Sequence, residues 1–364
     1  MRIAAFIISF TIVFLLTSRG GRQLIGSFFQ KDSVAPVPTR NIDEAEKIAA
    51  REMVKTLDDA QKEIDIFSQR VRRTFEDRRF AVLEKVAGEL RDSKELFQDG
   101  SWKLKVFHDA FDKPPTGTTR QWQQDFAAYG AWKQEFPDSV TARTAQIGTI
   151  VSWAWDARGT KYANETSTNA FAIFHERLKS ALVIFEEARA LPEKDPCLQL
   201  AGMRIALGQA WDAKYFDLLI SEALAFDPTF YHILVLRSYS LLPRWHGAPG
   251  DWEDFAEETN EILGGLGSET YARIIIARAQ DYTSIFVSTR ASWPETRKGL
   301  MILRDKYPDS FEILSYTAKL ATLGNDRKLA NECFEKIGNR HCSTVWKNPE
   351  HLVHYRTYAQ TGKW

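Results

Sequence analysis

The stretch between residues 241 and 255 holds an unusual combination of reactive side chains. Arg244, Trp245 and His246 are consecutive, and Asp251 follows shortly after them. A guanidinium, an indole and an imidazole in one loop can engage a carboxylate or a planar group, so an enzyme or small-molecule site is one hypothesis. The alternative is structural. Arg244 would then pair with a carboxylate, Trp245 would anchor the loop, and Asp251 would cap the next helix.

A second set of potential ligands lies near the C-terminus. His341 precedes Cys342, and His351 and His354 have a spacing that places both on one face of a helix. Isolated histidines of this kind are mostly surface or core residues, so we predict no metal site here. The sequence also lacks His-Glu-x-x-His, Cys-x-x-Cys, phosphate-loop and Gly-x-Ser-x-Gly patterns. We therefore assign no cofactor, no metal and no catalytic residue, and whether the chain is an enzyme stays open.

The elements that must position these residues are predicted to be helices. Of the 364 residues, 44% are hydrophobic and 26% are charged, which excludes disorder over most of the chain. Glycine and proline, at 20 and 13 residues, are scarcer than average, which favours helix. The 48 basic and 48 acidic residues cancel, so no nucleic-acid partner is expected. Three cysteines exclude a disulfide framework, although a single bridge between Cys333 and Cys342 stays open.

Residues 1–20 are typical of a signal peptide or a signal anchor. Arg2 precedes an apolar run from Ile3 to Leu16, and small residues stand before a cleavage position at Gly21. The run is shorter than the roughly 20 apolar residues that span a bilayer, and basic residues on both sides weaken the case for translocation. The sequence therefore predicts an exported protein, periplasmic or extracellular, or a single-pass anchored protein with membrane contact through residues 3–18.

Three regions follow the N-terminal segment. Residues 21–42 contain closely spaced prolines and are predicted to form an extended linker. Residues 43–115 are predicted to be a charged helical region. Within it, residues 43–79 place opposite charges three or four positions apart, which indicates a solvated helix with one thin apolar face. Residues 116–364 are predicted to form the repeat domain.

This last region repeats a pattern of turn, helix, short break and helix, with turns predicted at Pro137, Asp195-Pro196, Pro228 and Pro308. The interval between Pro196 and Pro228 is close to the roughly 34 residues of a tetratricopeptide repeat, and Ala223–Pro228 has the typical end of its second helix. The best unit spans Asp309–Ile337, with Gly324 between its two helices. Other intervals between prolines are longer. The predicted fold class is therefore all-α, an irregular tetratricopeptide-like helical repeat array, or α-solenoid.

One stretch is similar to a known family. Pro243–Gly247 reads Pro-Arg-Trp-His-Gly, and Pro249–Trp252 reads Pro-Gly-Asp-Trp. Together they resemble the central signature of a bacterial family of tetratricopeptide-like proteins that is catalogued only as a domain of unknown function. Trp153–Gly159 and Phe97–Leu104 resemble it too, so that the resemblance covers about residues 70–290. It implies a helical-repeat fold, and it supplies neither an established activity nor catalytic residues.

Helical repeats without catalytic motifs predict a non-enzymatic scaffold that holds a protein or peptide partner in a concave groove. The candidate partner-binding residues are Arg237, Arg244, Trp245, His246, Asp251, Arg273 and Arg278. The alternative is an envelope enzyme or a small-molecule-binding protein that uses the loop of residues 244–251. A third hypothesis is that the charged helix of residues 43–79 docks into an envelope assembly while the repeat domain serves as a spacer.

Overall fold

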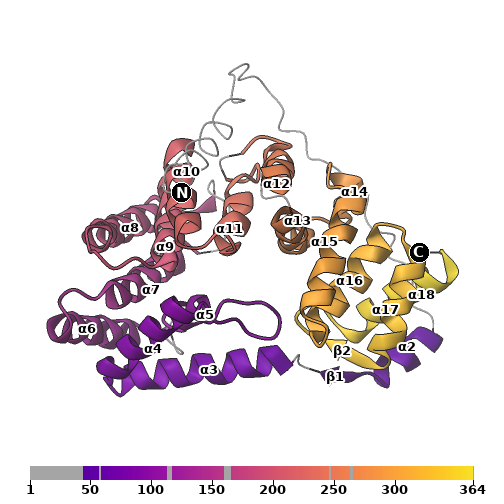
Figure 1. The fold of residues 1–364 in the computed structure, drawn as a ribbon, viewed down its shortest axis with the longest axis horizontal. Coiled ribbons are helices and arrows are strands. Elements are labelled where there is room, and N and C mark those ends of the chain that lie inside the picture. Colours follow the sequence, from indigo (N-terminus) through magenta and orange to yellow (C-terminus); the bar gives the residue numbers. More distant parts are fainter. Residues whose placement is uncertain are drawn as a thin grey trace. The chain divides into compact units, whose positions relative to one another are not determined.

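Figure 1 shows the fold in a computed structural model, which describes residues 44–56, 59–112, 117–159, 165–245, 247–262 and 265–363. The predicted signal or anchor segment, the predicted linker and His246 lie outside the described residues. The described chain is almost entirely helical, which confirms the all-α prediction. None of its helices combines the length and the apolar character that a membrane span requires.

The chain divides into two compact units. The first comprises Glu63–Ser240, and the second combines residues 44–62 with residues 241–363. The division falls within the first turn of α3 (Asp59–Glu76). The predicted boundary between residues 115 and 116 lies outside the described residues, and the first unit continues on both sides of it. The second unit is therefore assembled from the two ends of the described chain.

The first unit is built from nine described helices. After α3 these are α4 (Phe80–Ser93), α5 (Lys103–Asp109), α6 (Thr119–Glu135), α7 (Val140–Arg158), α8 (Thr168–Arg189), α9 (Pro196–Gln209), α10 (Ala213–Phe226) and α11 (His232–Ser240). Helix α7 packs against α8, α8 against α9, and α9 against α10 (Figure 1). From α7 to α10, helices that are consecutive in sequence are thus neighbours in space.

Capping side chains explain where several of these helices begin. The Ser139 hydroxyl accepts a hydrogen bond from the third residue of α7, and Ser167 does the same for α8. Asp195 caps α9, and Pro196 occupies the first turn, where its missing N–H costs nothing. The turn predicted at Pro137 is confirmed, because α7 starts shortly after it, whereas Pro196 is itself the first residue of α9.

Aromatic rings fill the core where α3, α4 and α6 meet. The ring centroid of Phe75 lies 4.7 Å from that of Tyr129 and 5.3 Å from that of Phe111. The Trp132 indole stacks on Phe80 at 5.5 Å. All five side chains are almost completely shielded from solvent. Burying each such ring stabilises the fold by about 1.5–3 kcal/mol, so this contact region holds the N-terminal helices of the unit together.

The second unit contains the remaining elements. They are α2 (Glu44–Arg51), β1 (Val54–Thr56), α12 (Asp251–Ile262), α13 (Gly265–Arg278), η2 (Ala279–Asp281), α14 (Ile285–Ser288), α15 (Trp293–Lys306), α16 (Phe311–Leu323), α17 (Arg327–Ile337), β2 (Arg340–Cys342) and α18 (Pro349–Thr361). Helix α13 packs against α15, α16 against α17, and α17 against α18. Helix α2, from the other end of the chain, packs against α18.

The predicted continuous helix over residues 43–79 is wrong. A short strand, β1, separates α2 from α3 and pairs in parallel with β2, with Val54 opposite Arg340. The backbone N–H of Val54 donates to the carbonyl of Asn339 at 2.8 Å. The backbone of β1 therefore satisfies its hydrogen bonds on a partner far away in the sequence, which local charge patterning could not indicate.

The predicted helix pair of Asp309–Ile337 is confirmed. Ser310 caps α16 and Asp326 caps α17, each through a hydrogen bond from a backbone N–H. Gly324 follows the last residue of α16 as predicted. Buried side chains from this pair, including Phe334 and Ile337, form one core cluster with Trp346 and residues of α18. The C-terminal helix therefore completes the core of this helix pair.

The remaining features of this part of the chain concern α12, α13 and the cysteines. Trp252, Phe255 and Thr259 are buried on α12. Residues 274–276 are apolar and β-branched, but they lie within helix α13. All three cysteines are free and buried, so Cys333 and Cys342 are not bridged.

Candidate functional site

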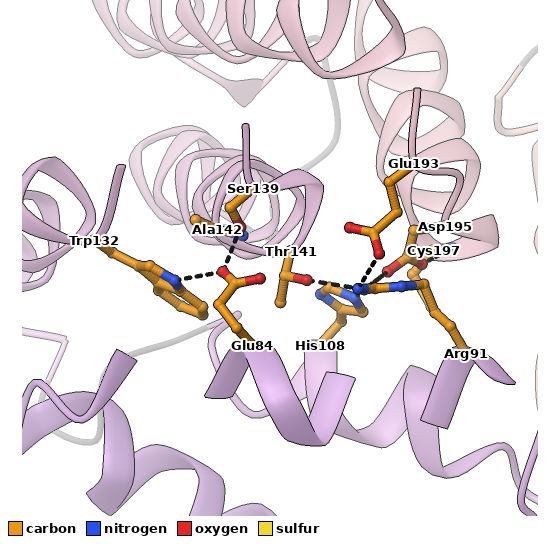
Figure 2. A network of polar contacts seen from close by, with 10 residues as sticks. All are labelled: Glu84, Arg91, His108, Trp132, Ser139, Thr141, Ala142, Glu193, Asp195 and Cys197. Atoms are coloured by element: carbon orange, nitrogen blue, oxygen red, sulfur yellow. Dashed lines mark hydrogen bonds and ion pairs between the residues drawn. The ribbon is translucent and has the colours of Figure 1, made fainter. Parts of the chain in front are cut away.

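A network of buried polar side chains joins four segments of the first unit (Figure 2). Arg91 belongs to the last turn of α4, and His108 belongs to α5. The Arg91 guanidinium donates to Thr141 Oγ1 of α7 at 2.8 Å and to Asp195 Oδ2 at 3.3 Å. Its other terminal nitrogen donates to Glu193 Oε1 at 2.8 Å. The His108 Nε2 atom lies 2.9 Å from the same Asp195 oxygen, so one carboxylate links α4, α5 and the start of α9.

Asp195 is the central acceptor of this network. Its side chain is fully shielded from solvent, and its second oxygen accepts the backbone N–H of Cys197 at 2.8 Å. Burial by itself would raise the pKa of the Asp195 carboxyl, but His108 and Arg91 hold this pKa below its usual value. The carboxylate is therefore ionised, and its charge is matched by hydrogen bonds and by the guanidinium. An ionised acid without such partners would be strongly destabilising at this position.

His108, Asp195 and Cys197 form a candidate metal-ligand group, because their potential ligand atoms all lie within 4.8 Å of one another. Burial raises the pKa of the Cys197 thiol well above its usual value, and the Asp195 carboxylate raises it further. A zinc ligand or a nucleophile must be a thiolate, which this surrounding disfavours. The Arg91 guanidinium would also repel a cation. The donor set therefore does not fit a metal centre, and it fits a structural link between helices.

A second branch of the network centres on Glu84 of α4 (Figure 2). Its carboxylate accepts the indole N–H of Trp132 at 2.7 Å and the hydroxyl of Ser139. Burial raises the pKa of the Glu84 carboxyl, while these two hydrogen bonds act in the opposite direction. Since Ser139 caps α7 at the same time, Glu84 connects α4 to α6 and to the N-terminus of α7.

An open groove of about 500 Å³ lies on the surface of the first unit, where α3 and α4 meet the segment before α5. We call it the α3–α4 groove. Its apolar lining residues are Ile66, Phe67, Val86, Leu90 and Phe97. Leu90 and Phe97 are buried, whereas the Ile66 side chain is 51% exposed. The groove therefore presents apolar side chains to solvent between two helices.

Five charged residues also line the α3–α4 groove: Glu63, Arg70, Glu89, Glu95 and Lys103. The Lys103 ammonium pairs with Glu95 at 2.6 Å and also lies over the Phe97 ring. Acids outnumber bases in this set. The lining therefore combines an apolar surface with a slightly acidic edge.

The structure brings together two of the predicted site residues, Arg244 and Arg278. Arg244 Nη2 donates to Asp281 Oδ1 at 2.6 Å, and Arg278 Nη1 lies 3.2 Å from the other oxygen of that carboxylate. The pairing of Arg244 with a carboxylate is the structural role that was predicted for it. The Arg244 side chain remains 44% exposed, whereas that of Arg278 is 4% exposed.

The other predicted loop residues have different surroundings. Asp251 is the first residue of α12, and its carboxylate accepts the backbone N–H of Ala248 at 2.7 Å. Asp251 thus closes the loop instead of capping the helix, because the loop turns back over its own carboxylate. Trp245 is half-buried, and His246 lies outside the described residues.

Arg237 and Arg273, the last two predicted site residues, lie in different units. The Arg237 guanidinium is buried over the ring of Phe216 and donates to Ser240 at 3.1 Å. Arg273 pairs with Glu269 of its own helix at 3.2 Å. Both side chains have contacts inside their own unit. A groove role for these arginines stays a prediction.

Sequence reasoning missed the network around Asp195. Asp195 and Pro196 were interpreted only as a turn mark, although an Asp-Pro pair also signals a capped helix start. Arg91 lies 104 residues from Asp195, and His108 lies 87 residues from it. Pairings at such separations carry no local signal. The α3–α4 groove was missed in the same way, because its lining residues resemble an ordinary amphipathic helix face.

Comparisons with protein-family models, with curated proteins and with solved structures found no match for this chain. The resemblance noted from the residues around Pro243 and Pro249 is therefore a proposal, and so is any function that it implies.

Proposed function

We propose that the chain is a scaffold of the tetratricopeptide-like type, an irregular α-solenoid, which binds an amphipathic helix of a partner protein in the α3–α4 groove. The observation that carries this proposal is the apolar lining of the groove, with Ile66 half-exposed above buried Leu90 and Phe97. Side-by-side packing of α7, α8, α9 and α10 supports the repeat architecture. The signature around Arg244 supports the same assignment by resemblance.

The groove favours a helix as its occupant. Its walls are two helices, and helix-in-groove recognition uses apolar residues at i, i+3, i+4 and i+7 against such a surface. The charged lining residues include three acids and two bases, and one of the bases already pairs with Glu95. A partner helix with basic residues beside its apolar face therefore complements this edge.

Site-specific photocrosslinking tests this proposal. A photoreactive amino acid at Val86, inside the groove, is expected to capture a defined partner in the protein's own cells. The change Ile66→Glu places a carboxylate on the apolar lining, and we expect it to abolish the crosslink. Because Ile66 is 51% exposed, this change should leave the fold intact, which circular dichroism and thermal unfolding will check.

Val183 provides the matched control. It lies on α8, is 57% exposed, and does not line the groove. Val183→Glu adds the same charge and should leave the crosslink from Val86 unchanged. Equal loss of the crosslink in both variants, or its survival in the Ile66→Glu variant, would refute the groove as the binding surface.

We also propose that the scaffold is exported or held at a membrane through residues 3–18. Support comes from the sequence, which places Arg2 before an apolar run. Separate soluble and membrane fractions from the protein's own cells, with N-terminal sequencing of each, test this. A chain that starts near Gly21 in the soluble fraction indicates a cleaved signal, and an intact N-terminus in the membrane fraction indicates an anchor. An intact chain in the cytoplasmic fraction would contradict both.

The alternative function is an envelope enzyme or a small-molecule-binding protein that uses the Arg244, Trp245, His246 and Asp251 loop. One observation favours it: Arg244 and Arg278 contact the same carboxylate, that of Asp281, and the Arg244 side chain stays 44% exposed. A screen of anionic metabolites by thermal shift tests it. Stabilisation that disappears in Arg244→Gln would support the alternative, and no stabilisation by any anion would remove it.

A further inference from the structure

Basic side chains gather at the C-terminal end of the second unit. Of the seven histidines in the chain, His341, His351 and His354 lie in this region. Lys319 on α16 and Lys347 in the segment before α18 act electrostatically on His351, as do the other two histidines. We call these five residues the C-terminal basic cluster.

The elements around the cluster hold it in place. Helix α16, which carries Lys319, packs against α18, which carries His351, and against β2, which carries His341. The Lys319 ammonium donates to the backbone carbonyl of Val345 at 3.3 Å. The His351 ring lies 5.9 Å from the Trp346 ring and 4.8 Å from that of Tyr355. The cluster is thus built on ordered helices and a buried tryptophan.

The basic groups of this cluster repel one another. Burial lowers the pKa of the Lys319 ammonium. Burial and then the neighbouring Lys319, His354, Lys347 and His341 lower the pKa of His351 to about 4. These side chains therefore destabilise one another's charged forms, and a bound negative charge would reverse the effect.

Two buried polar atoms, one in the cluster and one beside it, also lack hydrogen-bond partners among the described residues. His341 is 5% exposed, and its Nε2 atom has no hydrogen-bond partner among the described residues. Trp346 is fully buried, and its indole N–H also has no hydrogen-bond partner among the described residues. Buried polar atoms usually have a partner in the protein, in water or in a ligand. These atoms, together with the ammonium of Lys319, call for an acceptor.

A metal ion does not fit this cluster. The described residues contain one group of histidine, cysteine and acidic side chains close enough to share an ion, and that group is in the first unit, around Asp195. Two lysine ammoniums beside the histidines would repel a cation. An anion with several acceptor oxygens supplies both the negative charge and the hydrogen-bond acceptors that this cluster needs, because ammonium, indole and protonated imidazole groups are all donors.

We propose that the C-terminal basic cluster binds a phosphate group, either as the free ion or as the end group of a small soluble phosphomonoester. Within the cluster, Lys347 is exposed and His351 and His354 are half-buried, so that a ligand can reach it from solvent. The two lysines match the double negative charge of phosphate near neutral pH. This binding is separate from the scaffold function proposed for the first unit, since it uses only residues of the second.

Histidine NMR tests the proposal directly. Full-length protein labelled with ¹³C at histidine Cε1 is titrated at pH 7.5 with inorganic phosphate, glycerol 3-phosphate or acetate at matched ionic strength. We expect saturable shifts of the His341 and His351 signals with a phosphate probe, with an increase in the pKa of His351, and no shift of His175 in the first unit. The phosphate probe that binds with the higher affinity shows whether the ligand is the free ion or a phosphomonoester. Equal shifts with acetate, or no shift with either phosphate probe, would overturn the proposal.

Two variants locate the binding. Lys319→Met keeps an unbranched side chain only one atom shorter and removes the charge, and we expect phosphate binding to weaken about tenfold or more. Lys347→Gln changes an exposed residue with no effect on folding, and it should also weaken binding. Lys328→Met, on exposed α17 surface, is the matched control and should bind as the natural chain does. Unchanged affinity in both cluster variants would show that the ion binds elsewhere.

Discussion

At the scale of single residues, the Asp195 carboxylate is a charge that the fold can hold only because its partners are in place. It is fully shielded, and Arg91, His108 and the N–H of Cys197 all donate to it. Its negative charge and the Arg91 guanidinium compensate each other across 104 residues of sequence. Removing either charge deprives the other of a buried counter-charge and leaves it only its remaining partners, Glu193 for Arg91 and His108 for Asp195, which is a costly change in a protein interior.

Asp195→Asn should therefore destabilise the first unit strongly. Asparagine also caps helices well, so that the change removes the charge and keeps the cap of α9. We expect the free energy of unfolding to fall by about 3–5 kcal/mol. Urea denaturation followed by circular dichroism measures this loss. A loss near zero would mean that Arg91 is satisfied by Glu193 and Thr141 alone.

The exposed pair of Lys85 and Glu89 serves as the control, because its charged atoms are 3.8 Å apart on the surface of α4. Glu89→Gln should change the free energy of unfolding by less than about 0.5 kcal/mol. A double variant, Arg91→Met with Asp195→Asn, should be less destabilised than the sum of its two single changes, since neither buried charge is then left without its partner.

His351 should make the second unit sensitive to mild acid. Its pKa is about 4 in the folded chain and 6.5 in the reference state, so the unfolded chain binds more protons between these pH values. Neutral His351 makes its full contribution to the free energy of unfolding above pH 6.5, and this contribution falls as the pH decreases toward 4. The upper limit is about 3 kcal/mol, and solvent screening of the half-buried ring reduces it.

Hydrogen exchange of the α18 amides, corrected for the intrinsic pH dependence of exchange, measures this loss of protection. His351→Gln should flatten the profile between pH 6.5 and 4. His175→Gln, at an exposed position on α8, should leave it unchanged. Asp195 responds in a lower window: its pKa is held below the usual 3.8, so its contribution is lost only as the pH falls below that value. An unaltered profile in His351→Gln would show that another group controls the acid response.

At the scale of helices, the close packing of α8, α9 and α10 depends on glycine at position 202. A Cβ atom there would lie 2.5 Å from the ring of Phe185 and 3.3 Å from Leu219. Phe185 is almost fully buried and has little room to move. Gly202→Ala should therefore reduce the stability of the first unit by about 1–3 kcal/mol, because the added methyl group overpacks this contact.

Gly130→Ala is the matched comparison in the same unit. Gly130 is an exposed position within α6, and a Cβ atom there would meet nothing within 4 Å. The change should stabilise the unit by about 0.5–1 kcal/mol, since alanine favours helix and loses less entropy on folding. The midpoint temperatures of thermal unfolding of the two variants should therefore shift in opposite directions from that of the natural chain. Shifts in the same direction would contradict the packing argument.

Elements with local signals could be predicted, and those defined by distant partners could not. Ser310, Gly324 and Asp326 mark the ends of α16 and α17 within the sequence itself, and this helix pair was predicted correctly. Strand β1 has three residues and no alternating pattern, and it forms because β2 offers a parallel edge. The Arg244 ion pair was predicted as a type of contact, but its partner, Asp281, was not.

At the scale of the whole molecule, the two ends of the described chain depend on each other. Helix α2 packs against α18, and β1 pairs with β2, so residues 44–56 take their contacts from the C-terminal part of the second unit. The segment of residues 43–79 therefore does not act as one independent helix. It supplies α2 and β1 to the second unit, and its buried Val71 and Phe75 belong to the core of the first. Deleting it would damage both units.

A chain that ends at Ser240 should separate these dependences. Residues 63–240 retain their own core and the Asp195 network, so hydrogen exchange in α4, α7 and α9 should stay slow. Residues 44–56 lose β2 and α18 and should exchange at the rate of an unfolded chain. Both segments are measured in the same sample, so each serves as the reference for the other. If α2 stayed protected from exchange, its helix would form without α18. If exchange were rapid throughout α7 and α9, the first unit would require the second for folding.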